Sequence, residues 1–228
     1  MLRITNLRKS FPQPGGGRLE VLNIPSLTVD AAEQVVLSGR SGGGKTTLLH
    51  AIAGLTSVDS GQVVVGDIDI VQLSEGGRDR FRAAAIGYVF QTFNLLAGFT
   101  ALENVRLAMS FARHRPDPSR ARELLERVGL HDRAHYRPAQ LSVGQQQRVA
   151  IARALACQPK LLLADEPTAN VDPANQRAVI ELIRETCRDE EISLLLVTHT
   201  TEVSAQFDRV ERLEDINVVM RDLADVAP

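Results

Sequence analysis

The chain has no tryptophan, and aromatic residues make up only 4% of its 228 positions. Its apolar fraction of 44% and charged fraction of 24% are nevertheless those of an ordinary globular protein, which excludes a disordered or fibrous chain. It also lacks a basic excess, because 26 Lys and Arg face 28 Asp and Glu and leave a formal charge of −2. We therefore expect no nucleic acid, and no anionic lipid, as its main partner.

Paired cysteines and long apolar runs are missing as well. Cys157 and Cys187 stand in segments of helical pattern, without Cys-x-x-Cys or Cys/His spacing, so we expect two reduced thiols. No stretch approaches the roughly 18 to 20 consecutive apolar residues that a membrane-spanning helix needs. The N-terminal sequence carries charges where a secretory signal is apolar, which predicts a cytoplasmic protein. Action at a membrane would require a separate spanning partner.

The order of strands and helices predicts an α/β protein. Residues 2–8 and 19–29 flank a turn rich in proline and glycine, which predicts an antiparallel sheet at the start. A short buried strand over 35–38 precedes a glycine loop and a helix that Gly54 ends. The later expected elements are helices over 142–156 and 173–188, which alternate with strands over 160–165 and 192–198 as in βαβ units.

Between these parts, the pattern from about Thr100 to Leu141 is helical and is interrupted by the breaker Pro-Asp-Pro at 116–118. This predicts a small helical subdomain inserted into the α/β core. At 228 residues, one large domain with such an insertion is more consistent with the length than two independent domains.

The segment GRSGGGKTT fits the pattern G-x-x-x-x-G-K-[ST] and stands between an expected strand and an expected helix. In such a loop, successive backbone N–H groups and the helix N-terminus bind a phosphate. We expect Lys45 to reach the β- and γ-phosphates and the Thr46 hydroxyl to coordinate Mg²⁺. The predicted nucleotide-binding residues are Gly39, Arg40, Ser41, Gly42, Gly43, Gly44, Lys45, Thr46 and Thr47.

Two adjacent carboxylates, Asp165 and Glu166, end the apolar segment KLLLADEP. In a protein with a phosphate-binding loop, an acidic residue at the end of the neighbouring strand holds the hydration shell of Mg²⁺. The second carboxylate can polarise an attacking water as general base. Alone, the pair would equally fit a helix cap and a surface charge. Together with the glycine loop, it predicts phosphoryl transfer.

Several motifs of the sequence, in their order along the chain, resemble those of the ABC ATPases. The stretch LSVGQQQRVAIARAL, from Leu141 to Leu155, is similar to the signature motif of that family, and the strand ending in Asp165 follows at the usual distance. Gln91 matches the Q-loop, Ala169 to Asp172 the D-loop, and His199 the switch histidine. The resemblance covers essentially the whole chain. It implies ATP as substrate and a P-loop NTPase core with an N-terminal antiparallel β subdomain and an inserted α-helical subdomain.

On this basis we expect a single ABC-type ATPase domain over residues 1–228. The α/β core with the β subdomain would occupy 1–90 and 157–228, and the helical subdomain with the signature helix about 91–156.

The resemblance implies a head-to-tail dimer with two ATP molecules at its interface. Ser142, Gly144 and Gln145 of one copy would contact the γ-phosphate that the other copy binds. A serine hydroxyl and backbone amides at a helix start do form an anion site, although a simple helix cap would explain the same residues.

The resemblance also assigns roles within one copy. His199 would hold the γ-phosphate and the catalytic geometry near Glu166, and Gln91 would sense Mg²⁺ and the attacking water. Phe11 falls where the family places an aromatic residue that stacks on adenine. The expected catalytic residues are thus Glu166, His199 and Gln91, and the expected metal-binding residues Thr46, Gln91 and Asp165.

Two positions depart from the family pattern. Val143 stands where glycine is most common, and a β-branched residue does not adopt positive φ cheaply. Thr200 replaces the acidic residue that often follows the switch histidine. Because Glu166 and His199 are both present, we expect hydrolysis of ATP.

Within the family, FNLLAGFTALENV and VGLHDRAHYRPAQLS are similar to the ATPases of lipoprotein release, macrolide export and cell division. This implies that closure of the ATPase dimer drives a membrane-spanning permease. The permease would dock between Gln91 and Leu141 and hold the chain at the inner face of the cell membrane. The cargo is not specified by an ATPase subunit.

Three alternatives to this hypothesis are an ATPase of an importer, an ATPase of an assembly complex that has no membrane partner, and a kinase with the same phosphate loop. DNA-repair relatives insert a long coiled coil between the glycine loop and the signature, and the heptad pattern for one is absent here. A kinase with the same phosphate loop would have no use for LSVGQ or His199.

Overall fold

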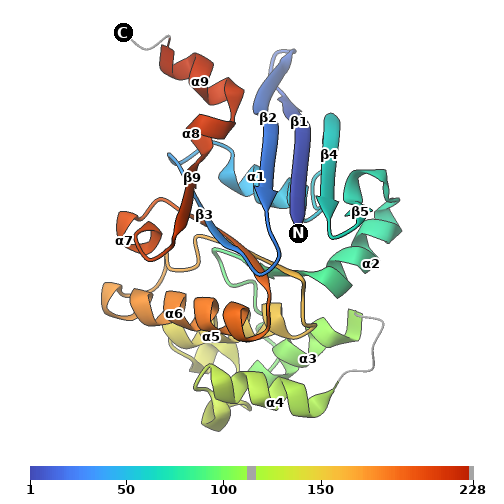
Figure 1. The fold of residues 1–228 in the computed structure, drawn as a ribbon. Helices are drawn as coiled ribbons and strands as arrows, with labels where there is room; N and C mark the ends of the chain where they lie inside the picture. The colour runs from blue at the N-terminus through green and yellow to red at the C-terminus, as the bar shows by residue number, and fades with distance from the viewer. Residues whose placement is uncertain (112–116, 226–228) are drawn as a thin grey trace.

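Two β-sheets and a group of helices form the computed structural model, which describes residues 1–111 and 117–225 (Figure 1). One sheet is antiparallel with strand order β2-β1-β4-β5, and the other is parallel with order β6-β7-β8-β3-β9. The antiparallel strands are β1 (Leu2–Pro12), β2 (Arg18–Val29), β4 (Ser60–Val65) and β5 (Ile68–Asp69). The parallel strands are β3 (Gln34–Ser38), β6 (Ile86–Val89), β7 (Leu161–Asp165), β8 (Ser193–Thr198) and β9 (Arg209–Arg212).

Helices cover both sides of the parallel sheet (Figure 1): those within residues 101–189 lie on the side away from the antiparallel sheet, and most of the others lie on the same side as that sheet. The α-helices are α1 (Lys45–Ile52), α2 (Glu75–Ala85), α3 (Ala101–Phe111), α4 (Pro118–Arg127), α5 (Val143–Leu155), α6 (Pro173–Asp189), α7 (Thr201–Ser204), α8 (Leu213–Ile216) and α9 (Val218–Asp225). Short 3₁₀ helices are η1 (Ile70–Gln72), η2 (His131–Arg133) and η3 (Pro138–Gln140).

The parallel sheet is buried on both faces. Strands β7 and β8 are continuous apolar runs, as parallel strands covered on both sides are. Alternate side chains of β8 enter two different cores. Leu194 and Leu196 pack with α3 to α6, whereas Leu195 and Val197 pack with α1 and the antiparallel sheet. Because β3, β7 and β8 are parallel neighbours, their carboxyl ends meet at one edge of the sheet, where the glycine loop begins.

The predicted elements match the observed ones closely, with specific differences. Strand β1 extends to Pro12 rather than ending at residue 8. Cys157 was expected inside a helix, but α5 ends at Leu155 and Cys157 lies in the following turn, before Gln158 with φ 50°. Part of the breaker at 116–118 lies outside the described residues, which resume at 117. Both cysteines are free thiols.

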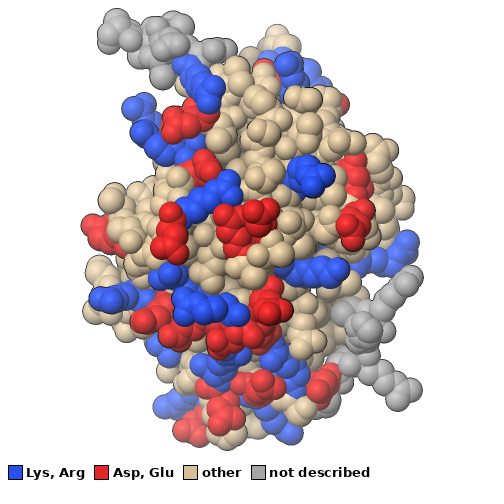
Figure 2. Space-filling view, in the orientation of Figure 1, with Lys and Arg blue, Asp and Glu red and all other residues tan. Residues whose placement is uncertain are grey.

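The surface is mixed in charge. On the face shown in Figure 2, acidic and basic side chains are interspersed rather than gathered into one broad patch of a single sign. No helix in the described ranges 1–111 and 117–225 is long and apolar enough to cross a membrane.

Candidate active site

The glycine loop runs from β3 into α1. At Gly44 the backbone has φ 96°, which side chains rarely adopt, and a Cβ there would lie 3.0 Å from Cγ1 of Val21 and 3.1 Å from Cδ2 of Leu22. Both backbone conformation and space therefore require glycine at the end of the loop. Val21 belongs to β2, so the antiparallel sheet forms one side of the loop.

Lys45 is buried, with 7% of its surface exposed, and its ammonium lies within the loop. Its Nζ donates to the carbonyl oxygens of Gly39 and Arg40, each at 2.8 Å. These two hydrogen bonds compensate the burial of the charge and hold the ammonium within the loop.

A cavity of about 440 Å³ opens over this loop and brings together every residue predicted to be catalytic or metal-binding. Gly39 and Arg40 line a neighbouring hollow of about 310 Å³. The side of Gly43 is covered by Met220 of α9. The lining of the larger cavity comprises Phe11, Val21, Ser41, Gly42, Gly44, Lys45, Thr46, Thr47, Gln91, Asp165, Glu166 and His199.

Asp165 ends β7 at the bottom of the cavity and is buried, with 5% exposed. Burial raises the pKa of its carboxyl, and the charge of Glu166 adds to the rise, whereas the Thr46 hydroxyl, His50 and Lys45 act in the opposite direction. Its Oδ1 is buried without a hydrogen-bond partner. A buried carboxylate oxygen in this state is a ready ligand for a cation.

Glu166 and His199 contact each other in the lining of the cavity. The Nδ1 atom of His199 lies 2.7 Å from Oε1 of Glu166. Glu166 has φ 45°, a left-handed conformation that costs a non-glycine residue roughly 1–2 kcal/mol. Its amide donates to the carbonyl of Val197 at 3.0 Å, which ties it to the end of β8. The fold thus holds this carboxylate in one orientation, and such local strain is typical of functional sites.

The segment that carries Gln91 is held by two residues that lie in predicted motifs but to which the sequence analysis assigned no role of their own. Nδ2 of Asn170 donates to the carbonyl of Gln91 at 2.9 Å. Arg153, in the last turn of α5, donates to the carbonyls of Phe93 and Asn94 at 2.6 and 2.5 Å. The D-loop and the signature helix therefore both contact this segment.

Ser142, Gly144 and Gln145 do not join the cavity. They form the start of α5, where the Ser142 hydroxyl accepts from the Gln145 amide at 3.3 Å and Oε1 of Gln145 accepts from the Ser142 amide at 2.9 Å. The helix-cap interpretation is thus correct as local geometry, but it leaves Ser142 exposed. Val143 is the first residue of α5, is 48% exposed and has no positive φ, so the position does not require glycine.

Phe11 lies near the end of β1 at the rim of the cavity, 38% exposed, with Nζ of Lys9 4.8 Å from its ring centroid. The carboxylate of Asp59 fixes this hairpin, because it accepts from the Ser10 amide at 2.6 Å and from Nη2 of Arg18 at 2.7 Å. The ring is therefore presented at the cavity entrance, and its stacking on adenine stays a prediction.

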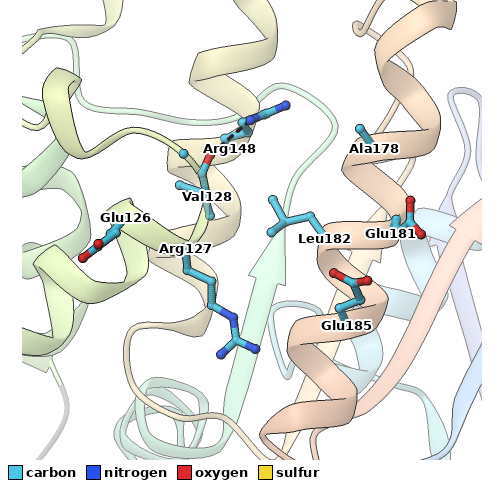
Figure 3. Close-up of a pocket in the computed structure, with 9 residues that line it drawn as sticks. Glu126, Arg127, Val128, Arg148, Ala178, Glu181, Leu182 and Glu185 are labelled. Atoms are coloured by element: carbon cyan, nitrogen blue, oxygen red, sulfur yellow. Dashed lines mark hydrogen bonds between the residues drawn. The ribbon is translucent and has the colours of Figure 1, made fainter.

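Another hollow, of about 440 Å³, lies between α4, α5 and α6 (Figure 3). Glu181, Leu182 and Glu185 line it from α6, while Arg148 of α5 donates to the carbonyl of Val128 at 3.2 Å. None of the residues predicted to bind nucleotide or metal or to act in catalysis lines this hollow, and we assign it no part in the reaction.

The family model for the ABC transporter matches residues 22–169, which include the glycine loop, the signature segment and the carboxylate pair. The chain belongs to the ABC transporter family. The lipoprotein-releasing system ATP-binding protein LolD 2 of Caulobacter vibrioides is 46% identical over 201 residues, 87% of this chain and 88% of the relative. The uncharacterized ABC transporter ATP-binding protein YvrO of Bacillus subtilis is 39% identical over 229 residues, 100% of this chain and 99% of that protein.

Among solved structures, the dimeric ATP-binding cassette MJ0796, in a post-hydrolysis state bound to ADP and Pi, has a TM-score of 0.86 at 34% identity. The match covers 94% of this chain and 95% of that one. The expected ABC family, the α/β fold with its antiparallel and parallel sheets, and ATP hydrolysis are therefore confirmed. The roles of individual residues in this ABC ATPase stay predictions, which the geometry of the cavity supports.

Proposed function

We propose that this ABC ATPase is the energising subunit of a transporter or mechanotransmission complex, in which ATP-driven dimer closure moves a separate membrane permease. One juxtaposition carries the proposal: Phe90 lines an apolar groove, and the next residue, Gln91, lines the nucleotide cavity. Relatives named for lipoprotein-releasing systems support an envelope process of that kind. The subunit would then lie at the inner face of the cell membrane through its permease.

The groove has a volume of about 570 Å³ and lies between α2, β6, α3 and α5. Its rim carries exposed apolar side chains, with Leu55 44% and Phe111 68% exposed. Exposed apolar surface next to a hollow is typical of a protein interface. A cytoplasmic element of the permease is the occupant we propose, because force applied at Phe90 would reach Gln91 directly.

The residues present fit Mg²⁺, since the orphaned oxygen of Asp165, the Thr46 hydroxyl and the Gln91 amide are hard oxygen donors. No group of three or more His, Cys, Asp or Glu that could hold a metal occurs among residues 1–111 and 117–225. This agrees with an ion that keeps several waters and phosphate ligands. The bound ion would neutralise charge on the phosphates.

In the reaction, Lys45 would exchange the carbonyls of Gly39 and Arg40 for the β- and γ-phosphates. Glu166 would orient a water in line with the γ-phosphorus and take its proton as the water oxygen bonds to phosphorus and the bond to the β-phosphate oxygen breaks, which releases ADP and phosphate. His199, already bonded to Glu166, would hold that carboxylate and contact the γ-phosphate. Gln91 would position the water from the opposite side.

We propose further that two copies close head to tail, so that Ser142, Gly144 and Gln145 of one contact the ATP of the other. These residues lie outside the lining of their own cavity, and Ser142 at the start of α5 is exposed, where the N-terminus of a helix favours an anion. The dimeric state of the solved relative supports this arrangement. Within each copy, the core would span 1–90 and 157–228 and the helical subdomain about 91–156.

The test is purification in mild detergent with membrane neighbours retained, followed by mass analysis of the co-purifying proteins. Glu166→Gln should abolish hydrolysis and trap an ATP-bound dimer. Phe111→Ser should release a multispanning partner and leave basal hydrolysis unchanged. The control is Val210→Ser, at an apolar position of β9 that is 42% exposed, and this variant should keep the partner. Retention of only soluble partners by the wild type would overturn the permease proposal and favour an assembly ATPase.

A further inference from the structure

The C-terminal segment of the chain packs against the glycine loop. Strand β9 leads into α8 and α9, which lie beside β2 (Figure 1). Asn217 anchors this segment: it is fully buried, its Oδ1 accepts from the Asn23 amide at 2.8 Å, and its Nδ2 donates to the Val21 carbonyl at 2.9 Å. Leu213 is fully buried as well. The residues between these two anchors therefore have defined positions.

Glu214 is one of those residues, and its carboxylate reaches the start of the loop. Oε1 of Glu214 accepts from the Arg40 amide at 2.8 Å. The carbonyl of the same peptide, that of Gly39, accepts from Nζ of Lys45 at 2.8 Å. A carboxylate and an ammonium thus fix the Gly39–Arg40 peptide at its two polar ends.

The contact is close on both carboxylate oxygens. A Cβ built on Gly39 would lie 3.3 Å from Oε1 and 3.3 Å from Oε2 of Glu214, so the carboxylate covers this glycine directly. Oε2 is buried without a hydrogen-bond partner. Burying a carboxylate with one unpaired oxygen costs desolvation free energy, which indicates that the hydrogen bond from the Arg40 amide holds Glu214 in this position.

The carboxylate is ionised at neutral pH. Burial alone would raise the pKa of Glu214, but the amides of Arg40 and of Glu214 itself, with the cations of Arg212 and Lys45, bring it below its usual value.

We propose that Glu214 is a positioning residue for the nucleotide: it holds the Gly39–Arg40 peptide, and through it the Lys45 ammonium, in the arrangement that receives the phosphates. A loop that is already ordered loses less conformational entropy when ATP binds, and the affinity is higher for that reason. The inference concerns ATP binding by the isolated chain and is independent of the proposed permease.

The test compares Glu214→Ala with Glu214→Gln, which keeps an acceptor oxygen for the Arg40 amide. The control is Asp215→Ala at the next, exposed position, whose side chain has no hydrogen bond or ion pair within the described part of the chain. The dissociation constant for ADP would be measured by calorimetry and the KM and kcat for ATP by phosphate release, with urea unfolding of the nucleotide-free chain as a check on the fold.

Loss of one charge-assisted hydrogen bond predicts that Glu214→Ala raises the ADP dissociation constant and the KM for ATP about five- to tenfold, with kcat within about twofold of wild type. Glu214→Gln should recover most of the affinity, and Asp215→Ala should match wild type. A dissociation constant for Glu214→Ala within about twofold of wild type would overturn the proposal, whether or not the variant unfolds more easily. Equal loss in the alanine and glutamine variants would also overturn it.

Discussion

Replacing Arg153 with methionine tests whether the link between the signature helix and the Gln91 segment governs hydrolysis. The guanidinium donates to the carbonyls of Phe93 and Asn94 at 2.6 and 2.5 Å, and these two residues have left-handed φ of 47° and 50°. Methionine keeps much of the side-chain length but donates no hydrogen bond. The substitution therefore removes the hydrogen bonds to the turn without leaving a cavity in place of the side chain.

The expected changes in the free energy of unfolding and in kcat follow from these hydrogen bonds and from the two left-handed residues. A hydrogen bond from a charged donor is worth about 1.5–3 kcal/mol when its acceptor is left unsatisfied. Because this turn is partly exposed, water would replace much of each bond, so we expect the free energy of unfolding to fall by about 2 kcal/mol in total. Left-handed residues cost roughly 1–2 kcal/mol each, so the released turn would relax and displace Gln91. A displacement that costs about 1.4 kcal/mol in the transition state lowers kcat about tenfold.

Urea unfolding and the kcat for ATP would be measured at a temperature where the variant is fully folded. Arg153→Lys should lie between the variant and wild type, since one ammonium lacks the planar fork that serves two carbonyls. Arg106→Met is the control, because the Arg106 side chain, on exposed α3 surface, donates to no acceptor within the described residues. A folded Arg153→Met variant with the wild-type kcat would refute the reasoning, even if it were less stable.

Three further predictions follow from local geometry. Gly61 has φ 97° and a Cβ there would lie 2.3 Å from a carbonyl oxygen of β1, whereas Gly66 has φ 64° and open space around it. In urea unfolding, the free energy of unfolding should therefore fall by roughly 3 kcal/mol for Gly61→Ala and by about 1 kcal/mol for Gly66→Ala. Equal losses in the two variants would contradict this steric explanation. Burial raises the pKa of Cys187 to about 12, so iodoacetamide at neutral pH should not label Cys187 in the folded chain. In urea, it should label both Cys187 and Cys157. Rapid labelling of Cys187 in the folded chain would contradict its burial. Phe11→Ala should weaken ADP binding about three- to tenfold and leave pyrophosphate binding unchanged, and an equal loss for both ligands would exclude stacking on adenine.

The sequence predicted those parts of the fold that depend on short-range pattern. The glycine loop, the apolar strands β7 and β8 and the capped helix after Ser142 all have local signals, and each lies where it was expected. The local signal of helix α2, a serine cap at Ser74, is opposed by Gly76 and Gly77 in its first turn, which disfavour a helix. The helix forms because the Ser74 hydroxyl accepts from the Gly77 amide at 3.2 Å and because its later turns pack against β6 and α3.

The same division holds for the active site. Motif spacing located Lys45, Asp165 and Glu166, because the chemistry requires those side chains at fixed positions along the chain. Arg153 and Glu214 act instead on backbone groups of distant segments, and a donor or acceptor for a backbone group can come from almost any sequence position. Only the tertiary structure shows which residue reaches which peptide.

The Gln91 segment receives contacts from three directions, so all three can act on the same short stretch of backbone. Asn170 holds the Gln91 carbonyl from the D-loop, Arg153 holds the next turn from the signature helix, and Phe90 lines the apolar groove. If a permease element fills that groove, its binding and the closure of the nucleotide site act on the same few backbone groups. Their coupling is then reciprocal: ATP must change the affinity for the permease by the same factor by which the permease changes the affinity for ATP. Both factors can be measured with the Glu166→Gln variant, in which hydrolysis does not deplete the bound ATP, and a factor of about one in both directions would mean that the groove and the nucleotide cavity are not coupled.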